Sequence, residues 1–283
     1  MTTRALVLGG GGVAGIAWET GVLAGLAESG VDVLNADLVI GTSAGSMVAA
    51  QVTSGTPLEQ LLARQIEPAA QTTELTPTQD IPAVMARFVE VLSGGGDPAD
   101  LRRRMGELAL STDTVPEEAR RAVMVARLPV HEWPQRAVQI TAVDTATGDP
   151  VVFDRESGVS LVDAVGASCS VPGVWPPVTI NGKRYMDGGM RSAENADLAG
   201  GYDKVLVLQV IRMPEESPWG GALAGQVAEL REAGSAVHVL AADDASVAAF
   251  GTNLLDPAVR TPSGLAGLAQ GKAEADAVKA FWS

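Results

Sequence analysis

Two short apolar runs near the N-terminus, each followed by a glycine-containing turn and a helical pattern, constrain the fold most strongly. Residues 5–8 (Ala-Leu-Val-Leu) lead into four consecutive glycines at 9–12, and residues 37–40 lead directly into a second turn at 41–45. Continuous apolar runs bounded by turns are typical of buried parallel strands, which are joined by helices. The order strand, loop, helix, strand, turn, helix therefore predicts an α/β fold, a three-layer α/β/α sandwich with a mostly parallel central sheet.

The remaining chain is expected to complete one domain over residues 1–283. Residues 57–127 contain six prolines and short helical patterns with almost no strand signal, which predicts a helical insertion beside the sheet. An Asn-Gly pair at 181–182 predicts a hairpin between strands at 178–180 and 183–186. Further strands are expected at 137–143, 150–153, 205–210 and 237–240, and further helices at 161–167, 244–250 and 264–281.

The charge balance limits the classes of partner. The chain has 20 Lys and Arg against 34 Asp and Glu, a net charge of −14, which argues against binding nucleic acid or attaching permanently to an anionic membrane. Transient apolar contact with a lipid surface stays compatible with this charge. No apolar run reaches the roughly 20 residues that span a bilayer. With a single cysteine, Cys169, interpreted as a small buried side chain, we expect a cytoplasmic protein.

The turn at 41–45 matches the pattern G-x-S-x-G, with Ser43 between Gly41 and Gly45. A buried strand precedes it and a helix follows, as a nucleophile elbow requires. The two glycines allow the sharp backbone turn, and the serine hydroxyl would stand at the positive end of the next helix. We therefore predict Ser43 as a nucleophile. A tight turn without chemistry remains the alternative interpretation of this pattern.

A serine nucleophile needs a base, and the chain contains only two histidines, His131 and His238. His131 has no flanking pattern of a catalytic triad, and His238 stands inside an apolar strand run. Asp187 is the better candidate, because it ends a predicted strand and precedes Gly188 and Gly189, which allow another backbone to approach closely. Partial burial would raise its pKa and improve its match to a base at neutral pH. A triad of Ser43, Asp187 and His238 stays open.

The glycine loop that begins at Gly9 has two possible functions. Its backbone N–H groups, at the start of a helix, suit the negative oxygen of a tetrahedral acyl-transfer intermediate. The loop also matches G-x-G-x-x-G at Gly10, Gly12 and Gly15, the pattern of an NAD(P)-binding oxidoreductase. That alternative requires an acidic residue at the end of the second strand, whereas Asp37 stands at its start.

Taken together and in this order, the motifs resemble the patatin-like phospholipase family. The glycine loop, the G-x-S-x-G at Ser43 and the D-G-G at 187–189 match its three blocks, and so does the stretch 167–178 that leads to the last of them. The resemblance implies a dyad of Ser43 and Asp187 and the hydrolysis of lipid acyl esters through an acyl-serine intermediate, without metal or cofactor. It also implies an oxyanion hole formed by Gly10, Gly11 and Gly12.

The chain departs from similar proteins at Ala14, where many of them carry Arg or Lys. A cation at this point could help to hold a phosphate. Because this chain lacks one there, the motifs do not select a phosphate ester, and phospholipids, lysophospholipids, neutral acyl esters and thioesters all remain alternative substrates. A catalytically weak lipid-binding protein of the same fold is the other functional class that stays open.

Overall fold

The computed structural model describes residues 2–212 and 217–283. Within these residues the strands form a single eight-stranded sheet in the order β5-β6-β3-β2-β1-β7-β8, with β4 paired to β3. The strands are β1 (Arg4–Leu8), β2 (Leu38–Gly41), β3 (Ala137–Asp144), β4 (Pro150–Phe153), β5 (Val178–Ile180), β6 (Lys183–Asp187), β7 (Lys204–Gln209) and β8 (Ala236–Ala241).

The pairs among β3, β2, β1, β7 and β8 are parallel, and β4, β5 and β6 join by antiparallel pairing. The sheet is thus mixed and mostly parallel, as the apolar runs predicted. β1 and β2 are neighbours, and Leu8 pairs with Gly41 at their carboxyl ends. This register places the two turns that follow these strands side by side at one edge of the sheet.

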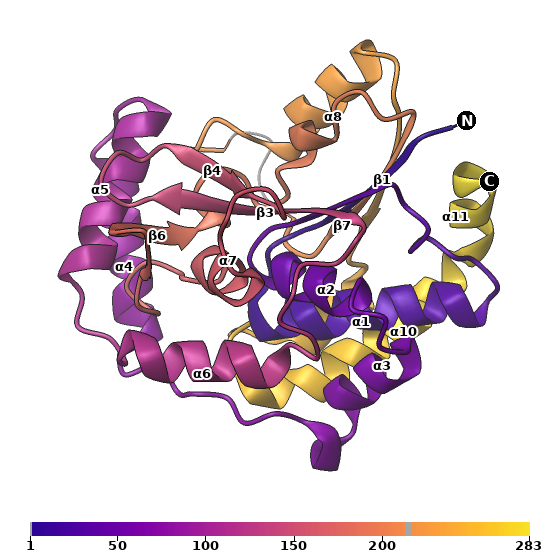
Figure 1. Cartoon of the computed structure of the whole chain (residues 1–283), viewed down its shortest axis with the longest axis horizontal. Coiled ribbons are helices and arrows are strands. Elements are labelled where there is room, and N and C mark those ends of the chain that lie inside the picture. The colour runs from indigo at the N-terminus through magenta and orange to yellow at the C-terminus, as the bar shows by residue number, and fades with distance from the viewer. Residues whose placement is uncertain (1, 213–216) are drawn as a thin grey trace.

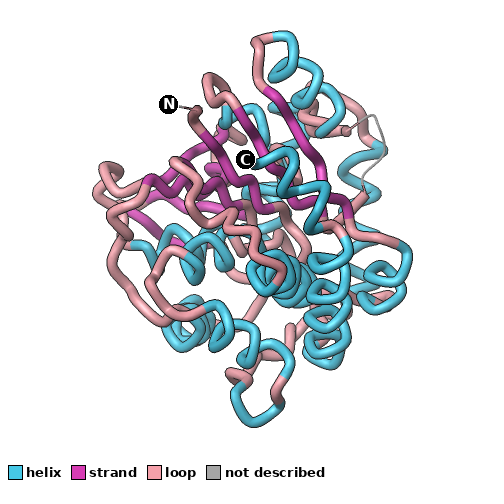
Figure 2. The backbone as a smooth tube through the Cα atoms, turned by 90° about the vertical axis from the view of Figure 1, so that its right-hand side faces the viewer, coloured by secondary structure: helices cyan, strands magenta, loops and turns pink. Residues whose placement is uncertain are grey.

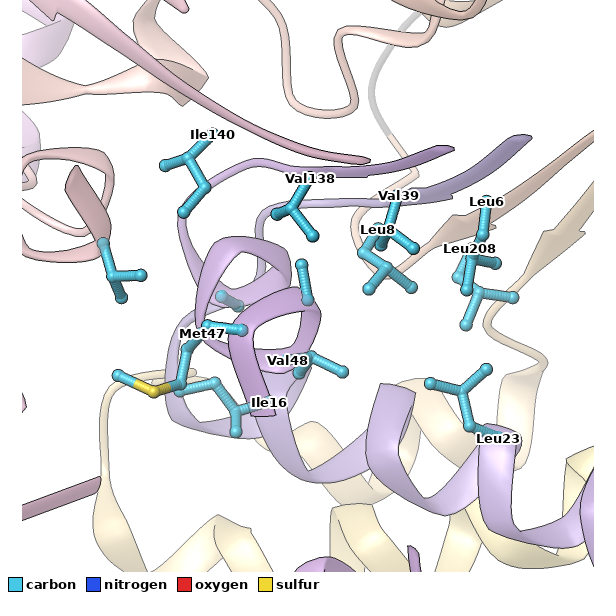
Figure 3. Packing of buried hydrophobic residues seen from close by; sticks show 14 of the residues in the cluster. Leu6, Leu8, Ile16, Leu23, Val39, Met47, Val48, Val138, Ile140 and Leu208 are labelled. Carbon is cyan, nitrogen blue, oxygen red and sulfur yellow. The ribbon is translucent and has the colours of Figure 1, made fainter. Parts of the chain in front are cut away.

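Alternating side chains of the central strands are buried on opposite faces of the sheet. Leu6 and Leu8 belong to a large apolar cluster with helical residues such as Met47 and Leu23, which Figure 3 shows packed against one face. Ala5 and Val7 belong to a second cluster on the other face. Because β-strand side chains alternate, one apolar run supplies both faces, and the sheet is covered by helices on each side.

The helices form the two outer layers (Figures 1 and 2). Residues of α1, α2, α6, α7 and α11 contribute to the larger cluster, and α10 packs on α1. α8 with a 3₁₀ turn at Ala196–Ala199 covers the opposite face. No helix within the described residues combines the length and apolar character needed to cross a bilayer. The helices are α1 (Gly12–Glu28), α2 (Ala44–Val52), α3 (Leu58–Ile66), α4 (Ile81–Ser93), α5 (Pro98–Ser111), α6 (Glu117–Arg127), α7 (Leu161–Ser168), α8 (Leu223–Glu232), α9 (Asp244–Phe250), α10 (Arg260–Ala273) and α11 (Ala275–Trp282).

α1 and α10 approach each other through glycines. A Cβ at Gly21 would lie 2.3 Å from the carbonyl oxygen of Gly264, and a Cβ at Gly267 would lie 2.2 Å from that of Trp18. Real Cβ atoms do not approach oxygen so closely, so larger residues would force the helices apart. The glycines therefore set the separation of α1 and α10, and through it the position of the loop that begins α1.

The region 57–127 contains the helices α3 to α6 joined by loops and no strand, but several of its prolines start helices instead of interrupting them. Pro98 occupies the first turn of α5, whose N-cap Asp97 accepts a hydrogen bond from Asp100 N–H at 2.9 Å. Proline is well tolerated there because the first N–H groups of a helix have no intrahelical acceptor. The helix expected at 264–281 is two helices, which meet at Glu274.

Candidate active site

The turn after β2 holds Ser43 in a strained conformation. Its φ of 52° lies in the left-handed region that residues with a Cβ rarely adopt, and α2 begins at the next residue. Gly45 makes this turn possible, since a Cβ there would lie 2.1 Å from the carbonyl oxygen of Leu8. The local geometry is that of a nucleophile elbow, with the Ser43 hydroxyl presented at the helix N-terminus.

Ser43 and Asp187 are in direct contact although 144 residues separate them. Ser43 Oγ donates a hydrogen bond to Asp187 Oδ2 at 2.7 Å, and both side chains are buried. Gly189 N–H donates to the other carboxylate oxygen at 2.8 Å. Gly188 is required beside them, because a Cβ there would lie 2.2 Å from Thr141 Oγ1. The D-G-G segment therefore orients a carboxylate toward the serine.

Burial changes the acidity of this carboxylate. Asp187 is 2% exposed, and loss of hydration raises its pKa from 3.8 to about 7, although the hydrogen bonds from Ser43 and Gly189 oppose the rise. A carboxylate with a pKa near neutrality accepts a proton far more readily than an exposed aspartate. The site thus combines a strained serine with a carboxylate that is suited to general base chemistry.

The glycine loop differs in one respect from the expected oxyanion hole of Gly10, Gly11 and Gly12. Gly10 N–H donates to the carbonyl oxygen of Ala193 at 2.7 Å, so in this structure it does not point freely into the site. Within the described residues, the N–H groups of Gly11 and Gly12 have no protein acceptor. Gly12 has a φ of +60°, and a Cβ there would lie 2.9 Å from the Leu254 carbonyl oxygen. Gly11 and Gly12 therefore remain the candidate donors.

Three side chains that the sequence reasoning did not assign hold the Ser43 backbone. Ser168 Oγ accepts a hydrogen bond from Ser43 N–H at 2.9 Å. Ser46 Oγ and Cys169 Sγ donate to the Ser43 carbonyl oxygen at 2.6 and 3.1 Å. Cys169 is half-buried, not fully buried as the sequence indicated, because one side of it lines the pocket at Ser43. Desolvation and the nearby Asp187 charge raise the pKa of its thiol to about 11, so it stays protonated at neutral pH. These contacts stabilise the strained turn, and for Ser168 and Cys169 the small residues at 167–170 were the only sequence signal.

Two buried carboxyl groups lie beside Gly9 at the start of the glycine loop. Glu19 is fully buried in α1, and Glu194 is 2% exposed. Burial raises the pKa of Glu19 well above its ordinary range, and the nearby Glu194 raises it further. Burial also raises the pKa of Glu194 to about 7. Burial thus favours the neutral form of Glu19 beside the glycine loop, and a glutamate inside an apolar helix is the sequence signal that could have identified it.

The histidines take no part in this arrangement. His238 lies on β8, which β1 and β7 separate from β2, and its ring centroid is 5.4 Å from that of Phe281. His131 is exposed and its Nε2 lies 3.0 Å from the Val125 carbonyl oxygen. The alternative triad is therefore not formed in the structure, where the Asp187 carboxylate contacts Ser43 directly.

The acidic residue required by a dinucleotide site is also misplaced. Asp37 precedes β2, and its carboxylate accepts a hydrogen bond from Arg4 N–H at 2.8 Å at the beginning of β1. This is the opposite end of the strands from the glycine loop. The ribose contact expected of an NAD(P)-binding protein has no counterpart there.

The comparison with protein families agrees with the residues that meet at this site. Residues 6–199 match the family described as patatin-like phospholipase, a stretch that includes the glycine loop, Ser43 and Asp187. The chain belongs to the patatin-like phospholipase family. Membership makes it a hydrolase of ester bonds, and a lipid ester hydrolase in general terms. No curated protein matches the sequence.

Solved structures give distant similarities. VipD from Legionella pneumophila is 12% identical with a TM-score of 0.47, over 98% of this chain and 67% of that one. The type III effector protein ExoU is 14% identical with a TM-score of 0.41, over 98% of this chain and 53% of that one. The chain thus spans about two thirds of the first protein and half of the second.

Proposed function

We propose that this member of the family hydrolyses acyl esters of lipids, with Ser43 as nucleophile and Asp187 as its base. The observation that carries the proposal is the 2.7 Å hydrogen bond from a strained, buried serine to a carboxylate with a pKa near 7. An unassisted serine hydroxyl is a weak nucleophile and needs an adjacent group to accept its proton. Asp187 is the group in contact with it.

The steps follow from the positions of these atoms. As Ser43 Oγ attacks the acyl carbonyl carbon, its proton passes to Asp187 Oδ2, and the N–H groups of Gly11 and Gly12 stabilise the resulting oxyanion. Collapse of this intermediate expels the alcohol, which takes the proton from Asp187, and leaves an acyl group on Ser43. Water then attacks the acyl carbon, with Asp187 again accepting a proton. The second collapse releases the carboxylic acid and returns the proton to Ser43 Oγ.

Active-site labelling tests whether the serine is reactive. The folded wild-type protein is treated with an alkyl fluorophosphonate, and the modified residue is mapped by mass spectrometry. We expect one adduct on Ser43, formed faster than on any other serine. An intact protein that stays unlabelled would instead indicate the catalytically weak lipid-binding alternative.

Three variants test the assignment of the base. We expect Ser43→Ala and Asp187→Asn to lose hydrolysis of a short-chain chromogenic ester by at least about 10³-fold, because residues that act as a unit fail together. His238→Ala should keep most of the turnover. If the folded His238→Ala variant is as inactive as Ser43→Ala, a histidine takes part in proton transfer and the two-residue mechanism is wrong.

A further inference from the structure

A small pocket opens in front of Ser43, and its wall carries two arginines. Arg120 and Arg127 come from α6 and line the pocket together with Ser43, Trp175 and Glu74. The two arginines are seven residues apart, which is close to two helical turns, so both project from the same face of α6. Their guanidinium groups therefore lie in the same pocket as the nucleophile.

The guanidinium groups are buried and held in place. The Arg120 side chain is 8% exposed, and the carbon between its nitrogens stands 3.8 Å from the ring centroid of Trp175. The Arg127 side chain is 7% exposed. A fixed, planar guanidinium is the group that binds a carboxylate or phosphate most specifically, because its N–H groups match the spacing of two anionic oxygens.

The carboxylate of Glu74 forms ion pairs with both arginines. Arg120 Nη1 donates to Glu74 Oε1 at 2.7 Å, and Arg127 forms an ion pair with Glu74 Oε2. The Glu74 side chain is only 4% exposed. It belongs to the segment 71–80, which contains neither helix nor strand. Glu74 thus connects this segment to the pocket, and its carboxylate stands where the carboxylate or phosphate group of a ligand could bind the two arginines.

The positive charge of this region exceeds its negative charge. Arg260 is 4% exposed and lines an adjoining pocket with Arg127, and its charge lowers the pKa of Arg127. Burial lowers the pKa of both α6 arginines to about 10, which leaves them charged at neutral pH. Three buried guanidinium groups therefore lie in this region, and Glu74 pairs with two of them, in a chain whose net charge is −14. Buried charge of one sign is costly without partners, and such an excess indicates a site for an added anion.

The size of the pocket shows what must move before a substrate binds. Its volume is about 30 Å³. A cavity of this volume has room for only a few water molecules. An acyl ester with a headgroup does not fit while Glu74 is in place. Displacement of Glu74 would enlarge the pocket and free two guanidinium groups beside Ser43 in the same movement.

We propose that Arg120 and Arg127 form an anion-binding subsite that holds a phosphate or carboxylate group of the ester substrate, and that Glu74 occupies this subsite until the substrate displaces it. The inference rests on the proposed ester hydrolysis at Ser43. It names the substrate class as acyl esters that carry an oxyanion within a few bonds of the ester. Ala14, in the first turn of α1, has no charge, and in the described structure the cations of this pocket come from α6.

A binding experiment tests the subsite without requiring turnover. Wild-type protein is titrated with dodecyl phosphate, dodecanoate and a neutral dodecyl glycerol ether, each below its micelle concentration, and tryptophan fluorescence reports binding beside Trp175. We expect the better of the two anionic probes to bind at least tenfold more tightly than the neutral one. The comparison of phosphate with carboxylate identifies the preferred anion. Equal affinity for all three probes would overturn the proposal.

Variants with a matched control assign the effect to named residues. Arg120→Gln and Arg127→Gln should each weaken binding of the anionic probe at least tenfold, and Glu74→Gln should strengthen it severalfold. Arg121→Gln is the control, since Arg121 lies on α6 but is half exposed and pairs with Asp163. If a single arginine variant does not fold, the double variant Arg120→Gln/Glu74→Gln removes one charge of each sign and should still lose the preference for the anion. Unchanged binding in folded variants would overturn the proposal.

Turnover separates a failure of this inference from a failure of the proposed function. The values of kcat/KM are compared for a monoacylglycerol phosphate and a monoacylglycerol with the same acyl chain. We expect the wild-type ratio to favour the phosphate ester at least tenfold, and Arg127→Gln to remove this preference. If both esters react equally, the subsite is wrong and ester hydrolysis stands. If neither reacts while the anionic probe still binds, the subsite stands and ester hydrolysis is wrong.

Discussion

Replacing Asp187 with asparagine should stabilise the protein at alkaline pH while it removes the base. Asparagine has the shape of aspartate, so its oxygen can accept from Gly189 N–H and its amide can donate to Ser43 Oγ. Both hydrogen bonds of the wild-type carboxylate are thereby retained. The variant lacks the ionisable carboxyl group, whose charged form is costly to bury in the folded protein.

The magnitude follows from the two pKa values. The folded pKa of Asp187 is about 7, against 3.8 for the ordinary group. Between these two pH values the Asp187 carboxyl is ionised in the unfolded chain but protonated in the folded chain, so the free energy of unfolding of the wild type falls as the pH rises. Below about pH 4 and above about pH 7 this group causes no further change. At about 1.4 kcal/mol per pKa unit, the cost reaches about 4 kcal/mol above pH 7 and is about 1.5 kcal/mol at pH 5.

Urea denaturation at pH 5 and pH 8 measures this difference. We expect the free energy of unfolding of Asp187→Asn, relative to wild type, to increase by about 3 kcal/mol between the two pH values. Asp149→Asn, which changes an exposed aspartate, should show no such trend. If the advantage of Asp187→Asn is the same at both pH values, the Asp187 pKa is not raised and its role as a base at neutral pH loses its physical reason.

Three further outcomes follow from the site. Hydrolysis of a neutral ester should rise with pH and reach half its maximum near pH 7, because Asp187 must be ionised to accept a proton; the same limb should persist in Glu194→Gln, and its loss there would assign the limb to Glu194. Gly45→Ala should destabilise the protein by about 3 kcal/mol, measured by urea denaturation, because its Cβ would lie 2.1 Å from a backbone oxygen. A fully stable variant would show that the elbow can relax. Cys169 should resist iodoacetamide at pH 8 in the folded protein and react in urea, since its pKa is about 11. Rapid labelling of the folded protein would contradict that pKa.

The parts of the site that follow local rules could be predicted from the sequence. A buried strand followed by G-x-S-x-G determines the backbone turn at Ser43 through short-range sterics. The D-G-G segment at the end of a hairpin strand predicts a carboxylate that another backbone can approach. Parallel pairing of β1 and β2 then explains why the glycine loop and Ser43 lie at one edge of the sheet.

Contacts between distant segments could not be predicted in this way. The N–H of Gly10 is occupied by the carbonyl oxygen of Ala193, a residue without any motif. Glu74 meets Arg120 and Arg127 only because the segment 71–80 folds over α6, and each looks like an ordinary surface charge in the sequence. The bounds of α3 and α5 were not predicted, because proline interrupts the interior of a helix but is also favoured in the first turn of one.

The close approach of α1 and α10 has a consequence for the order in which a working enzyme emerges during synthesis. While the ribosome is still adding residues up to about 260, the α10 side of α1 has nothing to cover Gly21 and Gly25. The first turn of α1 also lacks a contact until residue 254 is present, because the Leu254 carbonyl oxygen accepts a hydrogen bond from Ala14 N–H at 3.0 Å. Ser43 is made early, but its surroundings are completed only after α10 has left the exit tunnel. A nascent chain therefore carries Ser43 long before the contacts around the glycine loop and α1 are complete.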